Sequence, residues 1–235
     1  CTGDDKVSFT PAAYAEYTLQ GEPQAVRLPP GLPLADAALV EPLAVGLHGV
    51  GLSGMHHGDD VVVIGAGPIG VATAYWARRH GAGRVVVVAS SSRREAYARA
   101  LGASSFLCAE TDLVGQVVDE LGGPPAIVFE AAGAAGAIAQ SVAPVGVRGT
   151  VVGLGCCSHE DTWLPMRALF KEVRIQFSQT YTAGDYDHVI RTLLEDHPGP
   201  RAMVSSTVGL DALPARFEQL RGPTNECKVM VKPWQ

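Results

Sequence analysis

The chain has 235 residues, of which 47% are apolar and 18% charged, the composition of a folded globular protein. Its 27 glycines and 16 prolines stay below the share of roughly 25–30% that marks low-complexity chains. A net charge of −6, with no basic run beyond Arg78-Arg79 and Arg93-Arg94, argues against a nucleic-acid partner. The sequence shows neither an apolar leader nor a run of about 18 apolar residues, so we expect a cytoplasmic protein without a membrane span.

The first 52 residues contain two β-like segments, at 14–19 and 25–28, and an apolar helix at 34–52. From Asp60 onward, short β-branched runs alternate with helical stretches, the pattern of βαβ units in a parallel sheet. This pattern predicts strands at 61–64, 84–88, 105–107, 126–129, 150–153 and 173–177. It predicts helices at 68–80, 92–101, 112–121, 134–143 and 165–171. Six strands with intervening helices make a complete doubly wound α/β sheet of the dinucleotide-binding type.

The last part of the chain is predicted to add a helix at 185–195, a strand at 204–208, a helix at 211–221 and a strand at 228–232. We therefore divide the chain into 1–52, 53–180 and 181–235. The two flanks are expected to be parts of a second domain that the chain enters and leaves.

A glycine-rich turn joins the first strand of the sheet to its helix. Gly65-Ala66-Gly67-Pro68-Ile69-Gly70 has G-x-G-x-x-G spacing, and we expect all six residues to contact a dinucleotide. The first glycine permits the tight turn, the second lets the backbone approach a pyrophosphate, and the third lets the helix pack on the sheet. The free N–H groups of the helix start face the anion. The strand-to-helix position favours this interpretation over a purely structural turn.

The end of the second strand decides which dinucleotide is expected. NAD needs an acid there, about 20 residues past the glycines, to hold the ribose 2′-hydroxyl. The residues found instead are Ala89, Ser90, Ser91, Ser92, Arg93 and Arg94. Guanidiniums and hydroxyls suit a 2′-phosphate, so we favour NADP, with NAD as the alternative. The other interpretation puts the arginines on a solvated helix face, with Ser92 and Glu95 as a capping box.

Several stretches resemble the zinc-containing medium-chain dehydrogenase/reductase family, in particular its alcohol and polyol dehydrogenases. They lie at 13–17 (AYAEY), 26–29 (VRLP), 37–45 (AALVEPLAV), 63–70 (VIGAGPIG), 130–133 (EAAG), 149–153 (GTVVG) and 228–231 (KVMV). The resemblance implies a Rossmann domain at 53–180. It also implies that 1–52 and 181–235 are the end of, and the return into, a GroES-like catalytic domain. Most of that domain, including the cysteine and histidine that members supply to a catalytic zinc, is not in this sequence.

The resemblance implies that further residues border the cofactor. They are Ala132 and Gly133 after the fourth strand, Gly153 and Leu154 after the fifth, Ser178 after the sixth, and Lys228 facing the pyrophosphate. Each of them has an ordinary loop or strand residue as its alternative interpretation.

Glu41 is the one candidate metal ligand. The resemblance places it at the catalytic zinc, and a glutamate in an apolar segment is costly to bury unless it meets a cation. The alternative is a helix-terminus carboxylate. One glutamate does not hold a catalytic zinc, which usually takes three protein ligands and water.

Other donor residues give no zinc pattern. The cluster at 156–160 (CCSHE) lacks zinc spacings and is interpreted as a loop with buried thiols. His56 and His57 are expected in an exposed turn, and His80 at a helix C-terminus. Five cysteines without C-x-x-C spacing predict reduced thiols.

These features predict an oxidoreductase that transfers a hydride between NADP, or NAD, and a small alcohol or carbonyl substrate, with zinc assisting in the full-length protein. One alternative is a catalytically silent nucleotide-binding module that begins near Cys1. The other is a zinc-free quinone or enoyl reductase, against which the E-P-L-A-V motif argues. The resemblance also implies a homodimer or homotetramer, joined through the sixth strand at the open edge of the sheet.

Overall fold

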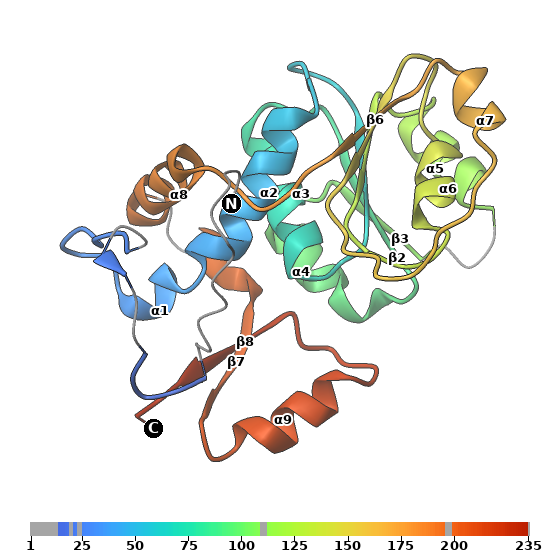
Figure 1. Ribbon diagram of the computed structural model, residues 1–235. Helices are drawn as coiled ribbons and strands as arrows, with labels where there is room; N and C mark the ends of the chain where they lie inside the picture. Colours follow the sequence, from blue (N-terminus) through green and yellow to red (C-terminus); the bar gives the residue numbers. More distant parts are fainter. Residues whose placement is uncertain (1–13, 19–20, 23–24, 109–111, 196–198, 235) are drawn as a thin grey trace.

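The computed structural model describes residues 14–18, 21–22, 25–108, 112–195 and 199–234. At its centre lies a parallel six-stranded sheet in the order β3-β2-β1-β4-β5-β6 (Figure 1). The strands are β1 (Val61–Ile64), β2 (Val85–Ala89), β3 (Ser105–Cys108), β4 (Ile127–Glu130), β5 (Thr150–Gly153) and β6 (Arg174–Phe177). The predicted α/β doubly wound fold is therefore confirmed, with each strand boundary within one residue of its prediction. The strand order reverses between β1 and β4, where open sheets of this kind bind ligands.

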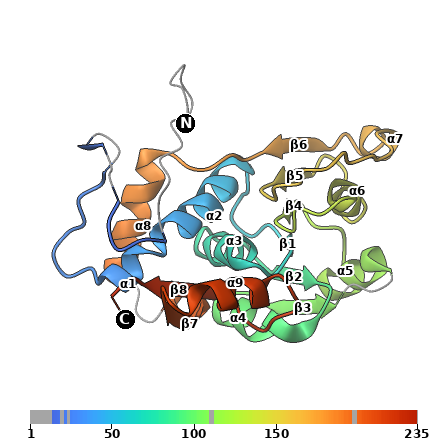
Figure 2. The same cartoon turned by 60° about the horizontal axis from the view of Figure 1, so that its bottom comes forward.

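Helices cover both faces of the sheet, because successive strand residues point to opposite faces. One buried cluster contains Val61 and Val63 with α2 (Val40–Leu52), α3 (Pro68–Arg79) and α4 (Glu95–Ala100). The other contains Val62 and Ile64 with α5 (Leu113–Leu121), α6 (Ala137–Val142) and α7 (Met166–Leu169). Figure 2 shows the sheet between these two helical layers.

The predicted helix at 34–52 is two helices, α1 (Leu34–Ala37) and α2, separated by a turn at 38–39. Pro42 lies in the first turn of α2, where a missing N–H is tolerated. α2 crosses α3 closely at Gly46, since a Cβ there would lie 2.9 Å from the backbone of Ala72 and Thr73. The buried Trp76 indole donates to the Leu43 carbonyl at 2.8 Å across the same contact.

The stretch Leu34–Leu52 passes a length and hydropathy test for a membrane-spanning helix. Half of its most apolar window is buried inside the protein, which is how a packed core helix also looks. The test finds one such stretch among the described residues, near the N-terminus, and it is weak support for a membrane span.

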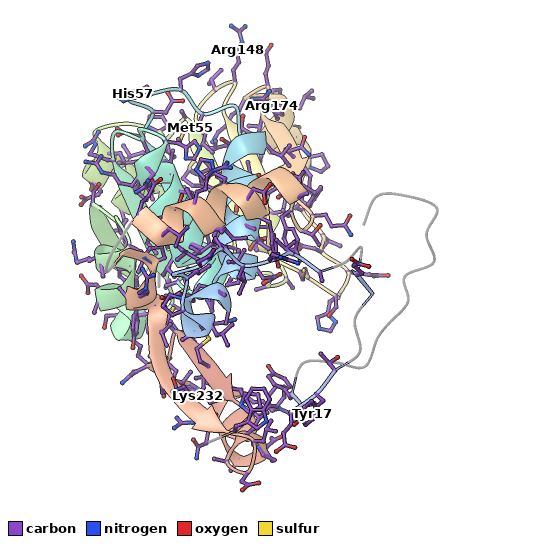
Figure 3. All side chains as sticks on the ribbon, turned by 90° about the vertical axis from the view of Figure 1, so that its left-hand side faces the viewer. Tyr17, Met55, His57, Arg148, Arg174 and Lys232 are labelled. Atoms are coloured by element: carbon purple, nitrogen blue, oxygen red, sulfur yellow. The ribbon has the colours of Figure 1, made fainter. Side chains whose placement is uncertain are left out.

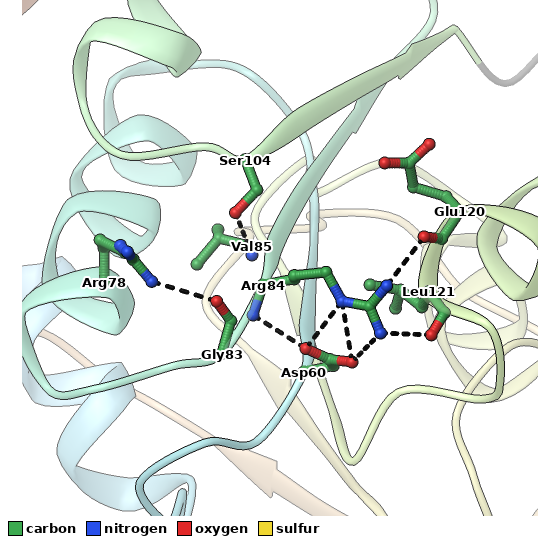
Figure 4. Close-up of polar contacts among 8 residues, drawn as sticks. All are labelled: Asp60, Arg78, Gly83, Arg84, Val85, Ser104, Glu120 and Leu121. Atoms are coloured by element: carbon green, nitrogen blue, oxygen red, sulfur yellow. Dashed lines mark hydrogen bonds and ion pairs between the residues drawn. The ribbon is translucent and has the colours of Figure 1, made fainter.

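Arg84 joins several segments at the amino ends of the strands, opposite their carboxyl ends (Figure 4). The Arg84 guanidinium donates to the Asp60 carboxylate, and the backbone N–H of Arg84 donates to the same carboxylate at 2.8 Å. It also donates to the carbonyls of Glu120 and Leu121 at the end of α5. These contacts join the starts of β1 and β2 to α5 through groups that the sequence leaves 24 to 37 positions apart.

After the sheet, the chain runs through α8 (Ala183–Glu195), η3 (Gly199–Met203), β7 (Val204–Gly209), α9 (Leu213–Leu220) and β8 (Lys228–Lys232). β7 and β8 form a separate two-stranded parallel sheet (Figures 1 and 2). α8 packs on α2, where His48 Nδ1 lies 3.0 Å from Asp185 Oδ2. Arg201 pairs with the buried Asp36 at 2.7 Å and ties η3 to α1.

The β-like segments expected at 14–19 and 25–28 are wrong where the structure describes them, since 14–18 and 25–28 form no strand. Tyr14, Tyr17 and Val26 are exposed, Leu28 packs half-buried against the core, and no described strand lies beside these segments to supply ladder hydrogen bonds. Tyr17 instead packs edge-on against Trp234, with ring centroids 6.2 Å apart. Figure 3 shows Tyr17 and Lys232 together at one end of the molecule, far from Met55, His57, Arg148 and Arg174.

Candidate functional site

A cleft of about 500 Å³ lies at the carboxyl ends of β1, β2 and β4. Nine residues predicted to bind the cofactor line it: Gly65, Ala66, Gly67, Ala89, Ser90, Ser91, Arg93, Arg94 and Ala132. Its other lining residues are Ile64, Val88, Ala131, Ala134, Gln140, Gly222, Pro223 and Thr224. The cleft therefore sits at the point where the strand order reverses.

The three glycines of the turn between β1 and α3 occupy three different environments. Gly65 has φ +108°, and a Cβ there would lie 2.9 Å from backbone atoms of Ala131 and Ala132. A Cβ on Gly70 would overlap the carbonyl oxygen of Gly65. A Cβ on Gly67 would meet nothing within 4 Å, because this residue faces the open cleft. The backbone at Gly67 can thus be approached by a ligand, beside the N–H groups that begin α3.

Pro68, Ile69 and Gly70 do not line the cleft; they begin α3. Pro68 is the first residue of the helix, and Gly70 is buried against the turn. Their place in the sequence motif reflects how the turn is packed, while the cleft surface comes from Gly65, Ala66 and Gly67.

The end of β2 supplies the cationic part of the cleft. Arg93 is exposed and Arg94 half-buried, and both line it from η2 (Ser92–Arg94). Arg94 Nε donates to the carbonyl of Glu226 at 2.8 Å, so this guanidinium is held from the opposite wall. Ser92 is the first residue of η2, which Ser91 precedes as the N-cap residue, and Glu95 accepts from Arg99 at 2.8 Å. This arrangement differs from the capping box predicted for Ser92 and Glu95, in which Ser92 would be the N-cap residue.

The opposite wall comes from a segment that sequence reasoning missed. Gly222, Pro223 and Thr224, between α9 and β8, line the cleft across from η2. The Glu226 carboxylate pairs with Arg216 at 3.0 Å and accepts from Ser206 at 3.1 Å. A hydrogen bond from the Ser205 side chain is the largest cause of a lowered pKa at Glu226; burial opposes it, and the Ser206 hydroxyl and the Arg216 charge lower the pKa further. No motif marks this segment in the sequence, because its position depends on the return of the chain to the sheet.

A buried glutamate shapes the third side of the cleft. Glu130 ends β4, and its Oε1 accepts from the N–H groups of Ala132 and Gly133, both at 2.7 Å. Gly133 has φ +61°, and a Cβ there would lie 2.8 Å from the backbone of Cys156. The loop after β4 is thus fixed from behind, while Ala132 and Ala134 face the cleft.

Four other predicted cofactor residues lie outside the cleft lining. Gly153 faces the Phe177 ring, 2.8 Å from where its Cβ would be, and Leu154 is buried against Gly49 of α2. Ser178 has a buried hydroxyl without a hydrogen-bond partner among the described residues. Lys228 begins β8 and is half-buried beside Cys227. Gly133, described above, likewise backs the loop without lining the cleft.

Glu41 is exposed in the first turn of α2, so the burial cost expected for it does not arise. Among the residues that the structure describes, no group of three or more His, Cys, Asp or Glu side chains comes together as a metal site. The described part of the chain therefore does not fit a complete catalytic zinc centre.

The other candidate donors in the described part of the chain likewise form no group of three. Cys156 is exposed and Cys157 half-buried, which corrects the expectation of buried thiols. His56 and His57 are exposed as predicted, and His80 ends α3, as expected. Cys1 and His197 lie outside the described residues.

Comparisons with known proteins match this geometry. The family model described as zinc-binding dehydrogenase matches residues 68–195, more than half of the chain. The chain is 31% identical over 207 residues to 2-dehydro-3-deoxy-L-galactonate 5-dehydrogenase of Pseudoalteromonas atlantica, covering 88% of this chain and 60% of that protein. It is 34% identical over 179 residues to sorbitol dehydrogenase 1 of Saccharomyces cerevisiae, covering 73% and 50%.

Solved structures of dehydrogenases have a similar fold. The 2R,3R-butanediol dehydrogenase from Bacillus subtilis superimposes with a TM-score of 0.80 at 27% identity, over 88% of this chain and 60% of that one. A Sinorhizobium meliloti 1021 protein, assigned as a zinc-binding dehydrogenase and bound to NADP, gives 0.83 at 30% identity, over 94% and 66%. The chain thus spans 60% of the first of its curated relatives.

Proposed function

Because the chain belongs to the zinc-binding dehydrogenase family, we propose that it binds NADP for hydride transfer between this cofactor and an alcohol or carbonyl substrate. The observation that carries the proposal is the cleft itself. An open glycine at a helix start faces two arginines across the carboxyl edge of a parallel sheet. In this proposal, 53–180 form the nucleotide-binding domain, and 1–52 and 181–235 belong to a catalytic domain.

Different residues of the cleft would bind different parts of the cofactor. The turn from Gly65 to Gly67 would hold the pyrophosphate through backbone N–H groups at the start of α3. Arg93 and Arg94, with Ser90 and Ser91, would hold a 2′-phosphate by charge-assisted hydrogen bonds. An acid at the end of the second strand would bind a ribose hydroxyl of NAD, but the last residue of β2 is Ala89, which supports NADP.

When bound, a nicotinamide dinucleotide supplies the hydride donor or acceptor. The chain's own part is to position that group: Glu130 fixes the loop from Ala132 to Ala134 that faces the cleft. Gly153, Leu154 and Ser178 extend the same edge toward β6, where the nicotinamide end would lie. Lys228 would act on the pyrophosphate at longer range. The described residues do not form a zinc site by themselves, and zinc contact by Glu41 remains a prediction.

The names of the relatives suggest a substrate class. Those named above are dehydrogenases of a deoxy sugar acid, of sorbitol and of a butanediol. We infer that this chain serves a hydroxylated, open-chain substrate of the same kind, oxidised at a secondary alcohol. The four described cysteines are free thiols, which supports a reducing, cytoplasmic location.

The open edge at β6 supports a symmetric assembly. Among the described strands, β6 pairs with β5 alone, and Phe177 is 66% exposed. Phe170 and Leu169 in the neighbouring α7 region are more than 70% exposed. We propose that a second copy of the chain covers this edge by pairing β6 with its own β6, which satisfies the open backbone groups. Light scattering of the purified chain tests this: a monomer at micromolar concentration contradicts it.

The decisive test of the function is a calorimetric titration of the chain with NADPH and with NADH. We expect NADPH to bind at least tenfold more tightly, since the 2′-phosphate gains charge-assisted hydrogen bonds worth about 1.5–3 kcal/mol. A preference for NADH overturns the cofactor assignment. Failure to bind either dinucleotide overturns the proposed function.

A further inference from the structure

Two adjacent cysteines begin a loop that the proposed function does not use. Cys156 and Cys157 follow β5 and Gly155, and both are free thiols. Cys156 is exposed, and Cys157 is half-buried with its Sγ donating to the His159 carbonyl at 3.5 Å. Two neighbouring thiols at the surface form a dithiol that reagents in solution can reach.

This loop packs against the wall of the dinucleotide cleft. Atoms of the Cys156 backbone lie 2.8–3.1 Å from where a Cβ on Gly133 would be, which shows how closely these two segments of the chain approach. A Cβ on Gly155 would lie 2.6 Å from Glu130 Oε2. Farther along, the Gly136 N–H donates to Asp161 Oδ1 at 2.7 Å. The segments 155–161 and 131–136 are therefore fixed to each other at both ends.

The same segment 131–136 presents Ala132 and Ala134 to the cleft on its other side. The N–H groups of Ala132 and Gly133 are held by Glu130. Glycines at 133 and 155 leave no side chain between the two segments to absorb a displacement. A group attached at Cys156 that shifts its backbone must move Gly133 as well, because the interior is closely packed.

The spacing of the two thiols selects the chemistry. Consecutive Cα atoms are about 3.8 Å apart across a trans peptide, whereas disulfides usually need about 4.4–6.8 Å. A direct disulfide between neighbours is thus disfavoured, but one larger thiophilic atom can bridge both sulfurs. Thiolates are soft ligands and prefer such centres over hard cations.

We propose that Cys156 and Cys157 form a dithiol site that binds one trivalent organoarsenical and that its occupation weakens dinucleotide binding by displacing segment 131–136. With phenylarsine oxide, two S–H bonds and the As=O bond are replaced by two As–S bonds, and one water is released. Arsenic stays trivalent, so no oxidant or reductant is needed. The second half of the proposal rests on the proposed function, whereas the first half does not.

The test uses phenylarsine oxide on the intact chain and on three single variants. Mass spectrometry is expected to show one adduct per chain, formed with loss of one water and removed by a dithiol but not by the same concentration of a monothiol. C156S and C157S are each expected to lose this adduct. C108S is the matched control, because Cys108 is an exposed thiol at the opposite edge of the sheet and its removal leaves the pair intact. Cys227 is buried, which raises the pKa of its thiol to about 11 and keeps it unreactive.

Two measurements then report whether the adduct displaces segment 131–136. Hydrogen exchange of the Ala132 and Gly133 amides is expected to accelerate at least tenfold in the adduct, and NADPH affinity to fall at least tenfold. Persistence of the dithiol-type adduct in C156S or C157S overturns the site. An adduct that changes neither exchange nor NADPH affinity overturns the coupling. If the unmodified chain binds no dinucleotide, the proposed function fails, while the adduct and the exchange data still decide this inference.

Discussion

The cleft and the region beyond it toward β6 are built in different ways. The cleft is made of turns within consecutive βα units, from Gly65 to Gly67 and from Ser90 to Arg94, and a return loop closes it. The region toward β6 contains single candidate residues from separate elements: Glu41 is exposed on α2, and Ser178 has a buried hydroxyl without a partner among the described residues. Backbone groups build the first region, whereas a site in the second requires side chains to converge. Anion binding can therefore be complete in a local segment, and a catalytic centre cannot.

Substituting the first glycine of the turn has the largest expected effect. We expect G65A to lower the free energy of unfolding by about 3 kcal/mol, because alanine is strained at φ +108° and its Cβ presses on Ala131. Urea unfolding followed by circular dichroism measures this. A loss below about 1 kcal/mol would mean that the turn relaxes without cost.

The neighbouring glycine separates binding from stability. G67A is expected to change the free energy of unfolding by less than about 0.5 kcal/mol, since the Cβ of the new alanine has open space around it. NADPH affinity should fall about thirtyfold, or ~2 kcal/mol, because the methyl group occupies the position of the pyrophosphate. Calorimetric titration of G67A and G65A with NADPH, at a temperature where both variants are folded, compares their affinities. If G67A binds NADPH with unchanged affinity, the proposal that the pyrophosphate lies against this turn is wrong.

The buried carboxylate behind the cleft is the next target. E130Q is expected to destabilise the chain by about 1.5 kcal/mol, because two backbone N–H groups lose a charged acceptor. The control is E172Q, in which the Glu172 carboxylate is 62% exposed and paired with Arg148, and which should cost less than about 0.5 kcal/mol. Equal losses in the two variants would show that Glu130 does not hold the loop.

Charge at the end of β2 is expected to affect one cofactor only. R93A should weaken NADPH about tenfold, or ~1.4 kcal/mol, and leave NADH within about twofold. R99A removes the same charge from α4, where Arg99 pairs with Glu95, and should leave both affinities unchanged. Parallel loss of NADH and NADPH affinity in R93A would point to a general electrostatic effect in place of a 2′-phosphate contact.

The smallest expected effect is a pH dependence at the α3–α8 contact. Burial lowers the pKa of His188, and the nearby His80, Arg191 and Arg79 lower it further, while Asp185 opposes them. The unfolded chain then binds more protons just below about pH 6.5, so stability is complete above that pH and falls on acidification toward the lowered pKa. H188N should flatten this part of the stability curve. The fluorescence of Trp76, whose ring lies 5.3 Å from His188, gives a local readout.

Local patterns in the sequence predicted most of the fold. Apolar runs of three or four residues marked the central strands β1 and β4, because a strand covered on both faces has no solvent-facing positions. The turn at Gly65 was predictable because its glycines are required by local backbone geometry: a Cβ on Gly65 or Gly70 would lie too close to neighbouring backbone atoms. The segment 25–28 failed because a β-like run needs a partner strand, and the sequence does not show whether one is present.

The sequence by itself determined the order of the βα units, the glycine-rich turn after β1 and the pair of arginines that follows β2. Only the tertiary structure decided that Gly222–Thr224 faces those arginines, and that Glu226 holds Arg94 across 132 positions of the chain. It also decided that Glu41 is exposed and that Gly133 lies against Cys156. The physical reason is range: propensity and glycine geometry act over a few residues, whereas a cleft wall or a metal site requires distant segments to meet.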